Sequence, residues 1–241
     1  VNGFKVAINS KGPEGETGYF RYEWEETYKT VPPFGSSSVY NRNTGTVEER
    51  TDNISECWVS NTSSSIILAT TDGLSVNEIQ DQTVRYVSFE SAELKQRYSI
   101  LVKQRPLDKS GYEFWTNLLE SNESAGSLFD TQPFPLTGNL RNIEDPQEAV
   151  LGYFDVASVT SQRLFIDNND VPDAQFVPSL WENCRANAGD TLVAYGLIPT
   201  FDAQSYLISY EVFPEGYLMV PRRCIDCTTK GTNVRPEFWI E

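Results

Sequence analysis

The sequence predicts a mainly β protein, an antiparallel β-sandwich with one embedded helix near residues 108–120. Apolar and polar residues alternate in many short segments, which is the pattern of half-buried strands. Only one segment has apolar residues at the spacing of three and four residues that is typical of a helix. The chain shows neither an internal repeat nor regular alternation of strands and helices, so a parallel doubly wound sheet is disfavoured.

The expected strands follow one another along the whole chain. Residues 4–8 and 20–28 alternate clearly and are separated by a Gly- and Pro-containing loop. Residues 30–55 are rich in Pro, Gly, Ser, Thr and Asn, which predicts a long surface excursion. Further strands are expected at residues 57–59, 65–69, 83–87, 96–104, 150–159, 163–166, 191–197, 205–213 and 217–220.

The helix is expected to begin after Pro106, with Asp108 as its N-cap. Tyr112, Trp115 and Leu119 then lie on one side of it. Residues 128–139 follow, and their prolines and aromatic residues predict a fixed loop that packs on the core.

Composition narrows the class of protein. The 241 residues are enough for a sizeable core, and we expect a single β-rich domain over residues 1–241. The net charge of −15 disfavours nucleic acid as a partner, because binding to phosphates depends on Lys and Arg. No run of apolar residues is long enough to span a bilayer as a helix.

Histidine is absent from the chain. This excludes Ser-His-Asp and Cys-His catalysis and zinc sites built on histidine. No other catalytic motif and no cofactor-binding motif stands out, so we expect no enzymatic activity and no cofactor.

The four cysteines are Cys57, Cys184, Cys224 and Cys227. An even number in an acidic chain favours structural disulfides in an oxidising compartment. Cys224-x-x-Cys227 could instead be a redox dithiol, but loop-like residues follow it rather than a helix, and the signal for zinc is weak. The sequence does not choose among three pairings. A first guess joins Cys224 to Cys227 and Cys57 to Cys184.

Two groups of acidic residues are candidate sites. Glu23 and Glu25 share one strand face, as paired carboxylates for hydrolysis would need, whereas Glu26 points the other way. An exposed acidic face is the simpler interpretation. Oxygen-rich residues that could bind calcium follow, although a plain turn is favoured: Asp167, Asn169, Asp170 and Asp173.

Aromatic residues of the second strand could line a ligand or partner surface, namely Tyr19, Tyr22 and Trp24. Core packing explains them equally well. Arg222 and Arg223 could meet an anionic ligand, but a solvated or salt-bridged turn is the more ordinary interpretation.

Several segments taken together resemble one known family. They are YFRYEWEETY (19–28), CW (57–58), RYSILVKQ (97–104), YEFW (112–115), GSLFDTQP (126–133), GNL (138–140), VLGYF (150–154), CIDC (224–227) and PEFW (236–239). In this order they resemble the domain-of-unknown-function 4249 family of Bacteroidota lipoproteins, over nearly the whole chain. The motif tryptophans suit a core, and Gly126, Gly138 and Gly152 suit turns or close backbone approach.

The resemblance implies a secreted lipoprotein at the outer membrane, on the cell surface or the periplasmic side. It implies an acylated N-terminal Cys and an immunoglobulin-like domain upstream, so the chain is expected to be a fragment that lacks its signal peptide and both these features. The expected partner is a TonB-dependent outer-membrane receptor, for which the protein would be an accessory or ligand-capturing subunit. A secreted hydrolase using acidic residues, a CxxC dithiol protein and an adhesive or structural surface protein remain as alternatives.

Overall fold

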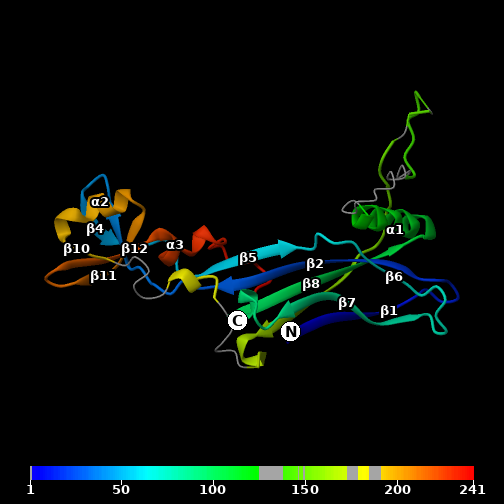
Figure 1. Cartoon of the computed structure of the whole chain (residues 1–241), viewed down its shortest axis with the longest axis horizontal. Helices are drawn as coiled ribbons and strands as arrows, with labels where there is room; N and C mark the ends of the chain where they lie inside the picture. The colour runs from blue at the N-terminus through cyan, green and yellow to red at the C-terminus, as the bar shows by residue number, and fades with distance from the viewer. Residues whose placement is uncertain (1, 125–137, 146, 149, 173–178, 185–190) are drawn as a thin grey trace.

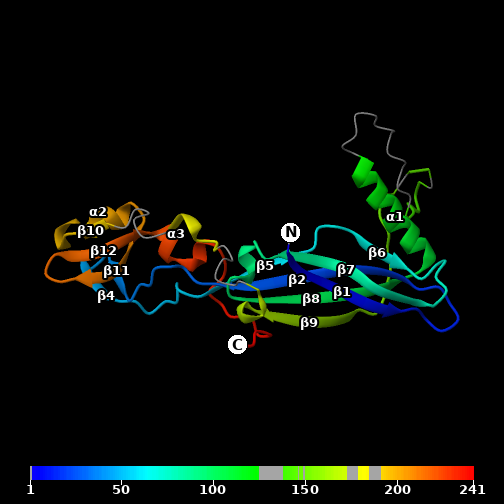
Figure 2. The ribbon, with the colours of Figure 1, turned by 60° about the horizontal axis from the view of Figure 1, so that its bottom comes forward.

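The computed structural model describes residues 2–124, 138–145, 147–148, 150–172, 179–184 and 191–241. These residues form an elongated molecule with two lobes (Figures 1 and 2). The larger lobe contains most of the strands and α1, and the smaller lobe contains β3, β4, β10–β12 and α2. Antiparallel sheets dominate both lobes, which confirms the prediction of a mainly β fold.

The main sheet of the larger lobe is built around β2 (Tyr19–Thr30). β8 (Arg97–Leu107) pairs with one edge of β2, and β5 (Cys57–Thr62) and β6 (Ile67–Thr70) share the other. β9 (Thr160–Asp167) pairs with β8 and completes a five-stranded sheet. Successive side chains of β2 point to opposite sides, so the main sheet has two faces that carry different residues of β2.

One face of this sheet is covered by a second, two-stranded sheet of β1 (Gly3–Lys11) and β7 (Glu78–Ser88). The apolar side chains between the two sheets form the core of the larger lobe, so this lobe is a small sandwich. A 3₁₀ helix at Ala92–Leu94 adds the buried Leu94. The core residues include Val6, Phe20, Tyr22, Ile79, Val84, Val87, Tyr98 and Ile100.

The expected helix is present as α1 (Lys109–Ser124). Its first turn is fixed by the carboxylate of Asp108, which accepts a 2.6 Å hydrogen bond from the Gly111 N–H. The helix lies across one end of the other face of the main sheet. There the Tyr112 ring packs on Tyr19, with 5.1 Å between their centroids.

The strand expected over residues 150–159 does not form, and β9 begins only at Thr160. Side chains hold this segment instead. The Tyr153 ring stacks on Phe114, and the amide of Asn139 binds both the N–H and the C=O of Phe154. Residues 138 and 152 cross so closely that a Cβ on Gly138 would lie 1.5 Å from the Gly152 carbonyl oxygen. The glycines of these two motifs therefore serve close approach, as expected.

The smaller lobe is a three-stranded sheet with a covering layer. Its strands are β10 (Thr191–Val193), β12 (Gly216–Pro221) and β11 (Tyr206–Val212), with β12 in the centre. The hairpin of β3 (Ser38–Asn41) and β4 (Thr46–Glu49), α2 (Ile198–Ala203) and the 3₁₀ helix Tyr195–Leu197 complete the lobe. The surface excursion expected at residues 30–55 thus contains this hairpin. The buried centre consists of Val193, Ile198, Ile208 and Met219.

Both disulfides lie between the lobes, beside α3 (Arg222–Ile225) and the 3₁₀ helices Glu182–Cys184 and Cys227–Thr229. All four cysteines are bridged, which confirms their structural role. The guessed pairing is wrong. Cys57 pairs with Cys227 and Cys184 pairs with Cys224, because α3 and the turn after it present two cysteines close in sequence to different neighbouring segments.

A third apolar cluster surrounds the bridges and joins the two lobes. It contains the buried Trp181, whose indole N–H donates a 2.8 Å hydrogen bond to the Thr30 hydroxyl, and Val220 from β12. Among the described residues, no helix has the length and apolar character that a membrane crossing requires. Gly126, residues 128–137 of the expected fixed loop and Asp173 lie outside the described residues.

We expect replacement of Cys57 and Cys227 by Ala to destabilise the fold more than replacement of Cys184 and Cys224. The first bridge spans 170 residues of sequence and the second spans 40. A larger closed loop restricts the unfolded chain more, by about 5 against about 4 kcal/mol in the chain-entropy model. Urea unfolding under oxidising conditions measures both. Equal losses of stability in the two double variants, or a larger loss when Cys184 and Cys224 are replaced, would contradict this expectation.

Candidate functional site

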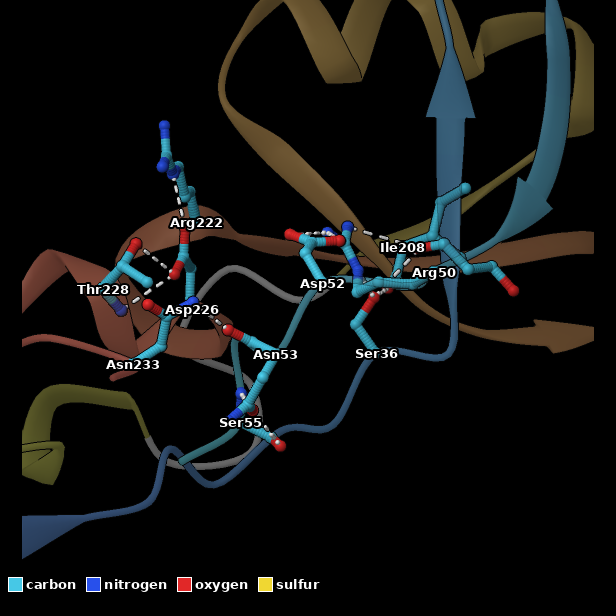
Figure 3. Close-up of polar contacts among 11 residues, drawn as sticks. Ser36, Arg50, Asp52, Asn53, Ser55, Ile208, Arg222, Asp226, Thr228 and Asn233 are labelled. Carbon is cyan, nitrogen blue, oxygen red and sulfur yellow. Dashed lines mark hydrogen bonds and ion pairs between the residues drawn. The ribbon is translucent and has the colours of Figure 1, made fainter. Parts of the chain in front are cut away.

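Side-chain and backbone hydrogen bonds connect several segments at the junction between the lobes, and Figure 3 shows these contacts. Two linkers, residues 31–37 and 50–56, cross it in opposite directions. The Ser36 hydroxyl donates to the Ile208 carbonyl oxygen at 2.5 Å, which fastens the first linker to β11. The Arg50 guanidinium donates to the Ser36 hydroxyl at 3.1 Å and to both Asp52 carboxylate oxygens, which connects the two linkers.

Asp226 is the buried charge of the junction, with 3% of its surface exposed. Its carboxylate accepts hydrogen bonds from the Thr228 N–H and hydroxyl, at 2.9 and 2.6 Å, and from the Arg222 Nε at 2.8 Å (Figure 3). Burial alone would raise the pKa of Asp226. The hydrogen bonds from Thr228 and Arg222 outweigh burial and hold that pKa below its ordinary value.

The turn after Asp226 also holds the second linker. The Cys227 N–H donates to the Ile54 carbonyl oxygen at 2.8 Å, and the Asn233 side-chain amide donates to the Asn53 carbonyl oxygen at 2.7 Å. With the Cys57–Cys227 disulfide, these bonds join the C-terminal segment to the entry of β5. The polar groups of the junction therefore bind one another and hold the second linker against the C-terminal segment.

A second buried carboxylate, Glu26, lies inside the sandwich of the larger lobe with 1% of its surface exposed. It accepts hydrogen bonds from Arg85 Nε and Nη2 at 3.0 and 3.2 Å, from the Tyr98 hydroxyl at 2.8 Å and from the Asn61 amide at 3.1 Å. Four donors from three different strands thus converge on one side chain. A buried charge is tolerated when it is paired and hydrogen-bonded in this way.

The charge of Glu26 influences its neighbours. Burial and the negative charge of Glu26 raise the pKa of the Glu93 carboxyl, which also lies 3.4 Å from Arg85 Nη2. Burial and the same charge raise the pKa of the Tyr98 hydroxyl, which therefore stays protonated and donates to Glu26. We interpret this group as a structural network that fixes β2, β7 and β8 against one another.

The face of the main sheet that points away from β1 and β7 is called the outer face here. Its centre carries rows of opposite charges across neighbouring strands. Glu23 binds Arg21 at 2.8 Å and Arg105 at 3.0 Å, and Glu25 binds Lys103. The predicted shared face of Glu23 and Glu25 is confirmed, but both carboxylates are ion-paired. They do not form an isolated pair of the kind that glycoside hydrolysis uses.

Arginine side chains on the outer face are supported by aromatic rings, a favourable arrangement for a guanidinium. The guanidinium carbons lie above the ring centroids at 3.7 Å for Arg21 on Trp115, 3.5 Å for Arg163 on Phe238 and 5.2 Å for Arg97 on Phe165. The first two of these contacts attach α1 and the C-terminal segment to the outer face.

The three aromatic residues suggested as a ligand surface do not share one face. Tyr19 is on the outer face against α1, whereas Tyr22 is completely buried in the sandwich, where its hydroxyl bonds Ser10 at 2.8 Å. Trp24 lies partly buried on the sandwich side, beneath Arg85 at 4.8 Å. Tyr22 and Trp24 therefore pack in or against the core, as the core-packing interpretation predicted.

The oxygen-rich loop forms a turn in the structure. The carboxylate of Asp167 accepts from the Asn169 N–H and binds Arg97 at 2.6 Å, and that of Asp170 accepts from the Asp167 N–H at 2.9 Å. These oxygens cap the 3₁₀ helix Asn168–Asp170. Among the residues that the structure describes, acidic and cysteine side chains form no cluster suited to a metal ion.

Arg222 forms an ion pair with Asp226 and so belongs to a salt-bridged turn, while Arg223 is exposed. Sequence reasoning missed the buried carboxylates Glu26 and Asp226 and the Arg85 side chain that pairs with Glu26. The strand alternation carried a signal for Glu26, because it has the same parity as Phe20, Tyr22 and Tyr28, which are buried. No comparable signal marks Asp226, whose burial depends on segments distant in sequence.

Comparison with known families gives one match. The model of the family described as Domain of unknown function (DUF4249) matches residues 1–163. The chain belongs to this family. The matched part of this DUF4249 protein contains the sandwich up to the first residues of β9 and the β3–β4 hairpin, and of the four cysteines only Cys57 lies in it. No curated protein and no solved structure matches the chain.

We expect Glu26→Gln to lower the free energy of unfolding by about 3 kcal/mol, because it removes the charge that Arg85 binds inside the sandwich. Glu25→Gln is the matched control. It lies next in sequence but pairs with Lys103 on the half-exposed outer face, where an ion pair contributes about 1 kcal/mol or less. Urea unfolding at pH 7 gives both values. Equal losses in the two variants would show that the network around Glu26 adds nothing specific.

The lowered pKa of Asp226 predicts acid sensitivity. A carboxylate whose pKa is lower in the folded than in the unfolded protein stabilises the fold above the unfolded pKa, near 3.8. That contribution is lost as the pH falls through this value toward the folded pKa. We therefore expect the stability of Asp226→Asn, measured by urea unfolding from pH 6 to pH 3, to fall less steeply than that of the wild type. Parallel curves would contradict this.

Proposed function

We propose that this DUF4249 protein is a non-catalytic lipoprotein of the outer membrane, which acts as an accessory or ligand-capturing partner of a TonB-dependent uptake receptor. In this proposal a lipid anchor holds it at the membrane, on the cell surface or the periplasmic side. The likeness of its motifs to Bacteroidota lipoproteins motivates the location and the partner.

The observation that carries the proposal is the junction, where two disulfides and the network around Asp226 join two lobes. Structural disulfides persist in oxidising compartments, which supports an exported protein. A fixed junction also suits an adaptor, because it holds the surfaces of both lobes at constant separation without further ordering on binding.

The distribution of charged groups supports binding over catalysis. Glu26 and Asp226 are buried and hydrogen-bonded within the protein, and Glu23 and Glu25 are ion-paired. Cys224 and Cys227 are completely buried in two separate disulfides, so their spacing does not form a dithiol couple. A hydrolase that used Glu23 and Glu25 would depend on carboxylates that are already paired with neighbouring cations.

The proposal is tested with the complete gene product, tagged and purified from gently solubilised outer membranes of its native cells. We expect a TonB-dependent receptor to co-purify in stoichiometric amount, as identified by mass spectrometry. An unrelated tagged outer-membrane lipoprotein from the same cells is the control. Purification of the protein alone, together with no thermal shift across a library of nutrients, would contradict the proposal.

A further inference from the structure

The small sheet of β10, β12 and β11 is apolar on both of its faces. Val193, Ile208 and Met219 point into the centre of the smaller lobe, where they are at most 2% exposed. The alternate residues, Leu192 and Tyr210, are paired on either side of Leu218 and therefore point to the opposite face. A sheet with one face in water normally carries polar residues on that face.

Leu192, Leu218 and Tyr210 form a continuous apolar row across all three strands, which we call the outward row. Leu192 and Tyr210 are 45% and 55% exposed. Near the junction the same face is closed, because Leu207 and Val220 pack into the cluster around the disulfides. The exposed part is therefore the half that points toward the free end of the smaller lobe.

Phe213 extends this surface at the turn between β11 and β12, which lies at the far end of the smaller lobe in Figures 1 and 2. Its side chain is 84% exposed. Scattered exposed apolar residues are ordinary, but an apolar row that ends in a protruding aromatic residue indicates a contact surface. Aromatic residues of this kind are frequent anchors in protein interfaces.

The charge of the smaller lobe is predominantly negative. Its two segments, residues 38–49 and 191–221, contain Glu48, Glu49, Asp202, Glu211 and Glu215 and one cation, Arg42, which pairs with Asp202. Glu215, two residues after Phe213, is exposed, whereas Glu211 pairs with Tyr217 on the other face of the sheet and accepts a hydrogen bond from the Tyr195 hydroxyl. A complementary surface therefore has an apolar pocket bordered by basic side chains.

We propose that the outward row and Phe213 are the docking surface for a partner protein that presents an apolar pocket bordered by Lys and Arg. The phenyl ring of Phe213 enters the pocket, and the basic border pairs with Glu215. A second copy of this chain and an anionic lipid surface are disfavoured by repulsion, since the chain carries a net charge of −15. The inference rests on the proposed function only where it expects this partner to be the receptor.

The test uses the complete gene product in its native membrane, with a photo-activatable amino acid in place of Phe213. The control carries the same amino acid in place of Val76, which is 62% exposed in the larger lobe. We expect illumination to link position 213, but not position 76, to one protein. Mass spectrometry of the linked peptide is expected to place the contact among apolar residues beside Lys or Arg.

Charge reversal provides the second readout. We expect Glu215→Lys to reduce the yield of this adduct at least about fivefold at low salt, because rim charges steer association. Glu237→Lys makes the same change at an exposed position of the C-terminal segment and leaves the yield unchanged. Thermal unfolding of each variant verifies that the fold is retained, since all the altered side chains are exposed.

Several results would overturn the docking surface: an adduct with a second copy or with lipid, a contact in an acidic segment, equal yields from positions 213 and 76, or no effect of Glu215→Lys. If the receptor co-purifies but position 213 does not reach a partner, the docking surface fails and the proposed function stands. If position 213 reaches a basic-bordered pocket on a protein other than a TonB-dependent receptor, the docking surface stands and the proposed function fails.

Discussion

The disulfide between Cys57 and Cys227 is the constraint on which the arrangement of the molecule depends. It joins the first residue of β5, in the larger lobe, to the turn that directly follows the smaller lobe in sequence. Because Cys224 in the same stretch bridges to Cys184, four consecutive residues carry both covalent links. Asp226 lies between them and binds the turn to Arg222. A few hydrogen bonds hold the linkers in addition, and covalent and polar contacts together connect the two lobes.

The two lobes differ in how completely the faces of their sheets are covered. In the larger lobe, the sheet of β1 and β7 covers one face of the main sheet, and charges on the outer face neutralise one another. In the smaller lobe, the sequence of β12 is an almost continuous apolar run, which is typical of a strand covered on both faces. Only one face of β12 is covered along its whole length. The mismatch between the sequence of β12 and its environment is the physical basis for assigning a contact to that face.

Sequence patterns predicted the elements better than their partners. β2, β8, β11 and β12 were recognisable because period-two alternation is a local property, and α1 because its aromatic residues recur at helical spacing. Residues 150–159 were also expected to form a strand, but the Asn139 side-chain amide binds the backbone N–H and C=O of Phe154 that a neighbouring strand would have used. The disulfide pairing and the burial of Asp226 were beyond reach, because both depend on contacts between segments far apart in the chain.

The smaller lobe is assembled from two distant parts of the chain, the β3–β4 hairpin and residues 191–221. Tyr40 and Val47 of the hairpin pack against a centre supplied by Val193, Ile208 and Met219. During synthesis the hairpin emerges about 150 residues before its partners, and the loop that must close to bring them together is correspondingly long. The larger lobe can form most of its sandwich from residues that precede this point. The smaller lobe can therefore form only after residues 191–221 have been made. The Cys57–Cys227 disulfide, whose formation transfers two electrons to an external oxidant, follows later still.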